Sequence, residues 1–371
     1  MPRPSHPERP ILGGTVNFPI LLAPMVGLSH LAFRNVVRSY VPKGARTMWP
    51  TEMLNSRRLP HEHFELVSEA LRSNRETDLC PQILANEEVS IRDSVRRLSS
   101  EWGASGIDIN MGCPVKKALS HNYGVALMGD PDYARAVVEM VRAHTDLPIG
   151  VKLRNQGLDG STDKGAATDQ MIEFASGLVE GGANWPTLHP RTAAQKRRGR
   201  AEWSQIKALR DAVPVAVIGN GDVQTAEDVD SMLEQTQCDA VMVGRALTAR
   251  PWLLWQWADR HGWPNPPGRE GERPPNTPEE EAQEMGQSLI RLIDELTLAH
   301  PLNRNGAKWS ESLLLRKYRF YLRNACPWLE FGHTLEARVS RAANVDQAKD
   351  ITAEFFAAES LRLSARTELR Y

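Results

Sequence analysis

The stretch Gly106-Ile107-Asp108-Ile109-Asn110-Met111-Gly112-Cys113-Pro114 joins a short apolar run to a turn that carries a cysteine. Isoleucines in such a run are typical of a buried strand. Gly112 lets the chain turn without a Cβ penalty and Pro114 fixes φ beyond it, so Cys113 is expected to face outward with little backbone freedom. The alternative is a small buried residue, since most free cysteines are buried. The stretch predicts a strand that ends in a thiol loop, where barrel enzymes keep their catalytic groups.

Eight runs of this kind follow one another along the chain, and each leads into a longer segment with helical periodicity. They are spaced mostly by about thirty residues, the length of one βα unit. Strands that alternate with helices require a parallel sheet, and eight of them most simply close into a (β/α)₈, or TIM, barrel. An open doubly wound sheet is the alternative, and the absence of a Gly-x-Gly-x-x-Gly turn after the first strand counts against it. The runs are Ile20–Met25, Thr47–Met53, Pro81–Ala85, Gly106–Asn110, Ile149–Arg154, Thr187–Arg191, Val215–Asn220 and Ala240–Arg245.

Helix start signals between the runs agree with the barrel. Glu87-Glu88, Asp130-Pro131-Asp132 and Thr225-Ala226-Glu227-Asp228 each stand before a segment with helical periodicity. We therefore expect an α/β fold with helices outside a parallel sheet.

The composition changes after residue 262. Prolines are frequent over 263–278, which predicts a linker without helix or strand. Beyond it the apolar residues Met285, Leu289, Leu292, Ile293 and Leu296 recur at helical spacing. We predict a barrel over 1–262, a linker over 263–278 and a C-terminal helical bundle over 279–371.

The charge is balanced, with 45 basic and 46 acidic residues and a formal net charge of -1. This balance argues against a protein whose whole surface grips nucleic acid, so a polyanion would have to meet local patches. One candidate patch contains Arg191, Lys196, Arg197, Arg198 and Arg200, and its alternative is a solvated loop. In a second, cations alternate with aromatic residues that could stack on bases or pack in the core: Arg316, Lys317, Tyr318, Arg319, Phe320, Tyr321 and Arg323.

The four cysteines lie far apart in the sequence, without the paired spacing of a zinc site or a redox dithiol. No stretch approaches the roughly 20 apolar residues of a membrane span, and the first residues lack a signal peptide's apolar segment. We expect a soluble, cytoplasmic monomer that binds neither metal nor membrane.

In a barrel, the residues that end the strands share one site. Here they include an amide, cations, an imidazole and two glycine turns, which together suit a polar planar ring and a phosphate. Gly219-Asn220-Gly221-Asp222 and Val243-Gly244-Arg245 fall where barrels often bind phosphate, so flavin mononucleotide (FMN) would fit. The alternative for each is an ordinary turn beside a surface arginine. The strand ends supply Pro24, Met25, Glu52, Gln82, Asn110, Cys113, Lys152, Arg154, His189, Asn220, Gly221, Asp222, Gly244 and Arg245.

These residues resemble those of the tRNA-dihydrouridine synthases. Ala23-Pro24-Met25-Val26-Gly27 is similar to the family's first-strand flavin motif, Asn110–Pro114 to its catalytic loop, and Asp239–Arg245 to its phosphate strand. The similarity extends through most of residues 18–258 and more weakly into the helical tail. The loop lengths and tail are most similar to the bacterial C subfamily, which modifies uridine 16 in the D-loop.

The resemblance implies a TIM barrel that, with its helical domain, cradles transfer RNA. It also implies that NADPH or NADH reduces FMN, and that hydride then passes to C6 of a uridine flipped into the barrel mouth. Cys113 would protonate C5, and Asn110, Arg154 and His189 would face the uracil. FMN would be contacted by Pro24, Met25, Val26, Gln82, Lys152, His189, Asn220, Gly221, Asp222, Gly244 and Arg245.

The sequence departs from the family pattern in two places. Leu28-Ser29-His30 replaces a Thr-Asp pair, and His189-Pro190-Arg191-Thr192 replaces His-Gly-Arg-Thr. Proline in place of glycine stiffens the turn and removes an N–H, so the resemblance does not carry over a backbone contact from this turn to the flavin phosphate or the substrate.

Two other functions stay open on the sequence. One is an FMN barrel that acts on a free pyrimidine or small enone, for which a basic helical tail is unnecessary. The other is a non-catalytic RNA-binding protein on a relic barrel, which would bind no flavin. No nicotinamide fingerprint occurs, so the choice between NADPH and NADH stays open.

Overall fold

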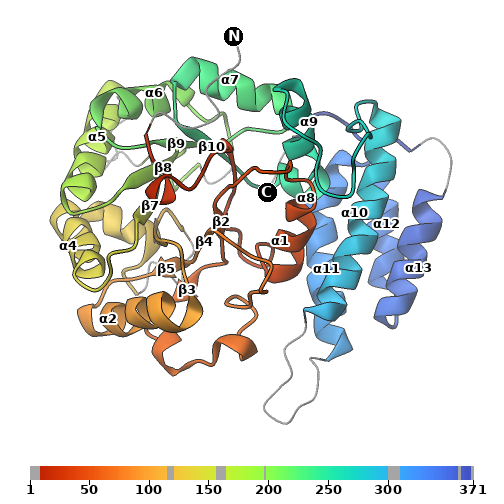
Figure 1. Ribbon diagram of the computed structural model, residues 1–371, viewed down its shortest axis with the longest axis horizontal. Helices are drawn as coiled ribbons and strands as arrows, with labels where there is room; N and C mark the ends of the chain where they lie inside the picture. Colours follow the sequence, from red (N-terminus) through yellow and green to blue (C-terminus); the bar gives the residue numbers. More distant parts are fainter. Residues whose placement is uncertain are drawn as a thin grey trace.

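The computed structural model describes residues 9–114, 121–155, 164–195, 198–299, 310–357 and 361–368. Its main sheet is parallel, with the order β1-β10-β9-β8-β7-β6-β5-β3, and it curls into the predicted barrel (Figure 1). All eight predicted runs contribute strands. The strands are β1 Ile20–Leu22, β2 Trp49–Pro50, β3 Leu54–Asn55, β4 Leu79–Cys80, β5 Gln82–Leu84, β6 Ile107–Met111, β7 Ile149–Arg154, β8 Trp185–His189, β9 Ile218–Asn220 and β10 Ala240–Val243.

The second run differs from the expected continuous strand. It contains only β2, which pairs with β4 in a separate two-stranded sheet, whereas β3, which pairs with β5 in the main sheet, begins just after the run at Leu54. Pro50 ends β2 and Pro81 separates β4 from β5, and a proline has no N–H to continue a ladder. Beside β1, the Thr47 hydroxyl donates to the Ile20 carbonyl at 2.5 Å, which ties this part of the chain to the first strand.

Helices cover the outside of the barrel (Figure 1). Two of the three predicted starts are capped: Asp130 accepts a hydrogen bond from the Tyr133 N–H at 3.1 Å, and Thr225 and Asp228 form a capping box. Glu87 precedes its helix without capping it. The helices are α1 Leu31–Arg38, α2 Glu88–Arg97, α4 Pro131–Arg142, α5 Lys164–Glu180, α6 Trp203–Ala212, α7 Ala226–Thr236, α8 Ala246–Ala249 and α9 Leu253–Arg260, with a π-helical turn over Leu98–Trp102.

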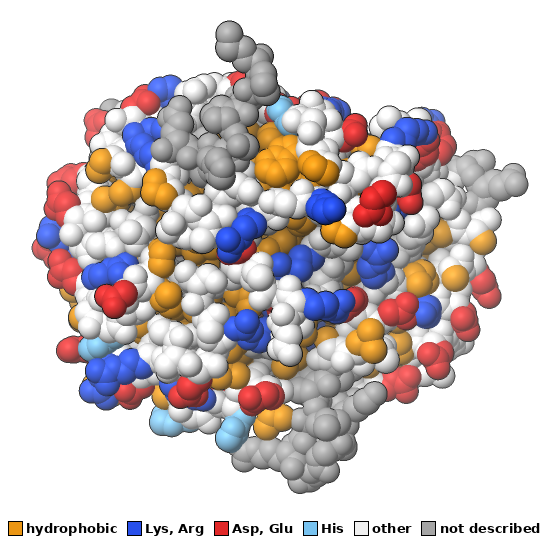
Figure 2. Space-filling view, in the orientation of Figure 1, with side chains coloured by type: hydrophobic (Ala, Val, Ile, Leu, Met, Phe, Trp, Pro, Cys, Tyr) orange, Lys and Arg blue, Asp and Glu red, His pale blue; other side chains and the backbone are white. Residues whose placement is uncertain are grey.

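The N-terminal segment closes one end of the barrel. Ile11, Leu12 and Val16 are buried in one cluster with Met48 and Trp185. Figure 1 is seen from this end, with the red N-terminal segment in front of the strands. On the same face in Figure 2, Lys and Arg side chains lie over the middle of the surface, and many Asp and Glu side chains lie toward its edge. The opposite end of the barrel is left for a site.

Four helices form a unit beside the barrel (Figure 1). They are α10 Pro278–Leu298, α11 Glu311–Ala325, α12 Gly332–Ser340 and α13 Val345–Phe356. The five apolar residues predicted to share a face of the first helix are all buried in α10. Between α9 and α10, residues 261–277 contain neither helix nor strand.

Buried polar contacts join the helical unit to the barrel. The Arg250 guanidinium pairs with the Glu281 carboxylate of α10 at 2.6 and 2.8 Å, and it also donates to the Ser364 carbonyl near the C-terminus at 3.2 Å. The Tyr321 hydroxyl of α11 donates to the Thr248 carbonyl at 2.8 Å. Because apolar residues of both parts belong to one core cluster, the barrel and the helical unit form one packed body.

Among the helices in the described ranges, none is long and apolar enough to span a lipid bilayer.

Candidate functional site

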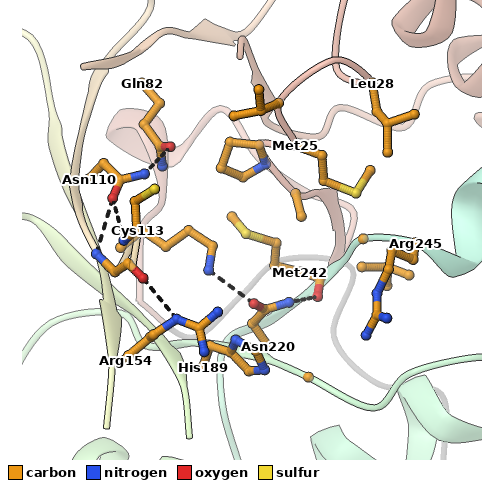
Figure 3. A pocket seen from close by; sticks show the side chains of 18 of the residues that line it. Met25, Leu28, Gln82, Asn110, Cys113, Arg154, His189, Asn220, Met242 and Arg245 are labelled. Carbon is orange, nitrogen blue, oxygen red and sulfur yellow. Dashed lines mark hydrogen bonds between the residues drawn. The ribbon is translucent and has the colours of Figure 1, made fainter. Parts of the chain in front are cut away.

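A pocket of about 330 Å³ opens where the strands end (Figure 3). Every site residue expected from the family resemblance lines it, although these residues are spread over more than two hundred positions of sequence. They are Pro24, Met25, Val26, Gln82, Asn110, Cys113, Lys152, Arg154, His189, Asn220, Gly221, Asp222, Gly244 and Arg245.

The thiol loop is held by hydrogen bonds from two neighbouring strands. The Asn110 amide oxygen accepts from the backbone N–H groups of Gly112 at 3.1 Å and Cys113 at 2.9 Å. On the other side, Arg154 Nε donates to the Gly112 carbonyl at 2.8 Å (Figure 3). Gly124 also packs on the loop, since a Cβ there would lie 2.6 Å from the Cys113 carbonyl oxygen. Cys113 is thus a partly exposed thiol on a fixed backbone, and the residues that follow it, 115–120, lie outside the described part.

Lys152 supplies a half-buried cation at the pocket. Its ammonium donates to the Asn220 amide oxygen at 3.1 Å, and the Asn220 amide nitrogen donates to the Met242 carbonyl at 2.7 Å, which fixes the direction of that amide. Burial, with the nearby charge of Arg154, lowers the pKa of Lys152 to about 8, and the Asp108 carboxylate opposes this shift. The ammonium form therefore still predominates at neutral pH, where it can face an anion or a carbonyl oxygen.

His189 lies against a guanidinium. Arg191 Nη1 is 3.2 Å from His189 Nε2, and because arginine can only donate, Nε2 is the acceptor and the ring proton lies on Nδ1. Burial, and then the charges of Lys152, Arg154, Arg191 and Arg245, lower the pKa of His189 well below its usual value. The imidazole is neutral at pH 7 and can donate through Nδ1.

Arg191 is buried, and its salt bridge occupies the Asp222 carboxylate, which is then not available to bind a ligand. Arg191 Nη2 donates to Asp222 Oδ1 at 2.5 Å, and the Ala201 N–H donates to Asp222 Oδ2 at 2.6 Å. The prediction of a surface cation at 191 is therefore wrong. At the His189-Pro190 departure, the Arg191 N–H donates to the His189 carbonyl at 2.7 Å, which keeps the turn closed without an N–H from position 190.

The two glycine turns at the pocket are packed closely against the protein's own side chains. Gly221 has a φ of +121°, and a Cβ there would lie 2.9 Å from His189 Cδ2. A Cβ on Gly244 would lie 3.4 Å from Met25 Sδ. With Arg245 beside them, these turns can bring backbone N–H groups and a guanidinium to an anion. Together with the half-buried ammonium of Lys152, this donor set fits an FMN.

The loop after β1 is closed by its own side chains. Ser29, in the first departure from the family pattern, donates through Oγ to the Ala23 carbonyl at 2.9 Å and accepts from the Met25 N–H at 2.8 Å. The buried Glu52 carboxylate accepts from the Gly27 N–H at 2.5 Å. The Leu28-Ser29-His30 sequence thus keeps Met25 at the pocket wall.

The helical unit completes the pocket. Phe320 and Asn324 of α11 line it, and Phe320 is 40 % exposed and packs on Gly27. By contrast Tyr318 and Tyr321 are 2 % and 1 % exposed, so the stacking alternative is wrong for them. Sequence reasoning missed Phe320 and Asn324 as site residues, although the mixed cation and aromatic pattern had singled out their helix. Of the first basic patch, Lys196 and Arg197 lie outside the described residues.

Within the described ranges, no three His, Cys, Asp or Glu side chains are grouped so that they could hold a metal ion.

The chain is similar to known proteins of one family. The family model for dihydrouridine synthase (Dus) matches residues 21–308. A probable tRNA-dihydrouridine synthase of Rhizobium leguminosarum bv. phaseoli is 35% identical over 63% of this chain and 69% of its own length. The probable tRNA-dihydrouridine synthase 1 of a Synechocystis strain is 32% identical over 68% of each chain.

A solved structure titled "Crystal structure of TcOYE with pHBA" superposes with a TM-score of 0.50 at 10% identity, over 72% of this chain and 95% of that one. This likeness bears on the fold alone and agrees with the barrel. From the family model and the curated relatives, the chain belongs to the dihydrouridine synthase family.

Proposed function

We propose that this protein reduces the C5–C6 double bond of a uridine in transfer RNA to 5,6-dihydrouridine. FMN is the proposed bound cofactor, and NADPH or NADH is the proposed reductant. The observation that carries the proposal is the convergence of Cys113, Lys152 and His189 on one pocket of a Dus-family chain. The proposed position is uridine 16 of the D-loop, as the loop lengths and tail suggest.

When bound, FMN would supply the hydride for C6. The thiol of Cys113 would give its proton to C5 as a general acid and regain a proton from solvent before the next turnover. Lys152, Arg154 and His189 would bind the uracil carbonyl oxygens, where negative charge grows in the transition state. Neutral His189 can donate through Nδ1, and Lys152 brings the positive charge.

The proposed cofactor contacts rest on the family resemblance and on the residues that line the pocket. We assign the ring of FMN to Pro24, Met25, Val26, Gln82, Lys152, His189 and Asn220, and its phosphate to Gly221, Asp222, Gly244 and Arg245. Asp222 would contribute its backbone N–H, because its carboxylate is held by Arg191 and the Ala201 N–H.

The helical unit supports an RNA substrate, because Phe320 and Asn324 place α11 at the edge of the pocket. We propose that the protein acts as a monomer. A transfer RNA substrate also supports a cytoplasmic protein.

Removing residues 279–371 would not separate an RNA enzyme from a small-molecule enzyme. The truncation would strip Arg250 of its Glu281 partner and expose the buried Tyr321 contact, so the barrel itself would lose stability. Point substitutions on α11 are the cleaner test.

The deciding experiment maps dihydrouridine by mass spectrometry in transfer RNA from cells with and without this gene. Wild type, Cys113→Ala and the matched control Cys238→Ala, which alters a buried cysteine, are added back. We expect loss at one D-loop position, restored by wild type and Cys238→Ala but not by Cys113→Ala. An unchanged map in cells without a second such gene would refute the proposal, and purified protein without visible flavin absorbance would refute the cofactor.

A further inference from the structure

A carboxylate inside the barrel is not explained by the chemistry above. Asp108, at the middle of β6, is 1 % exposed, and it is absent from the residues that line the pocket. Its Oδ1 has no hydrogen-bond partner in the described part of the chain, and its Oδ2 accepts from Gln82 Nε2 at 2.5 Å. A buried carboxylate is unfavourable unless a specific interaction requires it.

The hydrogen bond between Asp108 and Gln82 fixes the orientation of the Gln82 amide. A carboxylate can only accept, so Gln82 must turn its amide nitrogen toward Asp108 and its amide oxygen toward the next residue. That oxygen accepts from Asn110 Nδ2 at 2.6 Å. Asn110 Oδ1 is then left facing the loop, where it accepts from the N–H groups of Gly112 and Cys113 (Figure 3).

The strand pairing makes this chain of contacts possible. Gln82 of β5 lies beside Asp108 of β6 in the sheet register. Asp108 and Asn110 are two residues apart on one strand, so both side chains face the inside of the barrel. The two amides by themselves could be turned either way, since their oxygen and nitrogen ends have the same shape.

We propose that Asp108 is a positioning residue for the thiol: it fixes the direction of the Gln82 and Asn110 amides, and so holds the Cys113 loop at the pocket. This inference rests on the proposed role of Cys113 as the proton donor. Asp108 touches neither the thiol nor the pocket, and it acts through the two amides.

A purely stabilising role for Asp108 agrees less well with its surroundings. Burial raises the pKa of Asp108 to about 6, against the hydrogen bond from Gln82 and the charge of Lys152. The ionised form is therefore held at neutral pH at a loss of folding stability. The charged group that faces it is Lys152 of β7, whose ammonium hydrogen-bonds to Asn220, and the thiol of Cys80 is close enough to be affected by its charge.

The experiment exchanges donors and acceptors along the series of hydrogen bonds from Asp108 through Gln82 to Asn110. In Asn110→Asp the new carboxylate would face the Gln82 oxygen and repel it. In the double variant Asp108→Asn/Asn110→Asp, position 108 can donate to the Gln82 oxygen, the Gln82 nitrogen can donate to position 110, and the carboxylate at 110 accepts from both loop N–H groups. Asp108→Asn alone lets the amides turn either way.

The first readout is the alkylation rate of Cys113 by iodoacetamide against pH in the flavin-loaded protein. The reaction reports on this thiol because Cys80, Cys238 and Cys326 are buried. Since a net hydrogen bond is worth about a tenfold preference, we expect a roughly tenfold change of rate in Asn110→Asp, a smaller one in Asp108→Asn, and return toward wild type in the double variant. The matched control is Asp239→Asn, which alters a buried carboxylate bonded to the Val217 N–H and should leave the thiol unchanged.

The second readout separates the two half-reactions. We expect Asp108→Asn to slow the reoxidation of reduced flavin by transfer RNA more than it slows the reduction of flavin by NADPH, in which Gln82 is only one of several proposed flavin contacts. Equal slowing of both, a wild-type alkylation profile in Asn110→Asp, or no recovery in the double variant would overturn the proposal. If wild type showed no half-reaction with transfer RNA, the proposed function would be refuted. The alkylation rates of the three variants would still test whether Asp108 positions the thiol loop.

Discussion

Replacing Asp108 by asparagine should make the protein more stable at neutral pH. The pKa of Asp108 is raised by burial from 3.8 to about 6 in the folded protein. The folded state therefore binds more protons than the unfolded state between these values, so the free energy of unfolding falls as pH rises through this window and stays reduced above it. About two pKa units at 1.36 kcal/mol each correspond to ~3 kcal/mol.

Asparagine does not ionise, so the free energy of unfolding of the Asp108→Asn protein lacks this decrease with pH. We expect its stability advantage over wild type to grow by ~3 kcal/mol between about pH 4 and pH 7.5. Urea unfolding followed by tryptophan fluorescence at both pH values measures the two differences. Thr187→Val, another change inside the barrel, is the control and should parallel wild type. A difference independent of pH, or one that shrinks toward pH 7.5, would show that Lys152 and Gln82 compensate the buried charge and would refute the reasoning.

Four further outcomes follow from the site and its support. Cys113→Ser should slow the half-reaction with transfer RNA by at least about a hundredfold, because a hydroxyl is a far weaker acid, while stopped-flow reduction of the flavin by NADPH stays unchanged; a loss in both steps would contradict the role. Gly221→Ala should purify with less flavin, since φ is +121° and the Cβ would lie 2.9 Å from an imidazole carbon, and full visible absorbance would disprove this. Arg250→Met should cost about 3–5 kcal/mol in urea unfolding, because Glu281 keeps a buried charge, and a loss below about 1 kcal/mol would be inconsistent with the contact. Phe320→Ala should raise KM for transfer RNA about tenfold if the ring stacks on a base, and an unchanged KM would exclude that contact.

The sequence predicts the barrel and the membership of the pocket for one physical reason. Parallel strands end at the same side of a sheet, so Asn110, Lys152 and His189 could be grouped without knowing any distance. The end of β2 at Pro50, within the second run, could also have been expected, since a proline has no N–H for a ladder.

What the sequence does not predict depends on packing between distant segments. The burial of Arg191 arises from the Asp222 carboxylate and the Gly199 carbonyl, whose approach no local pattern encodes. Phe320 reaches the pocket because α11 is set against the barrel by contacts such as Tyr321 with Thr248. A helical pattern gives the buried face of α11, but it does not say which turn meets the pocket.

Asp108 and Lys152 illustrate how the barrel interior serves the site. Asp108 is buried and Lys152 is half-buried. Burial raises the pKa of Asp108 and lowers that of Lys152, so it favours the neutral form of each. A barrel built for stability alone would have apolar side chains at both positions. Yet each charge starts its own series of hydrogen bonds. Asp108 is linked through Gln82 to the thiol loop, and Lys152 is linked through Asn220 to the Met242 carbonyl. The two charges therefore fix which end of each amide is the donor, which the similar shape of the two ends would leave open. A variant that gains stability by losing the charge of Asp108 should lose the alignment of the thiol loop. A variant that gains stability by losing the charge of Lys152 should lose the alignment of Asn220 at the pocket wall.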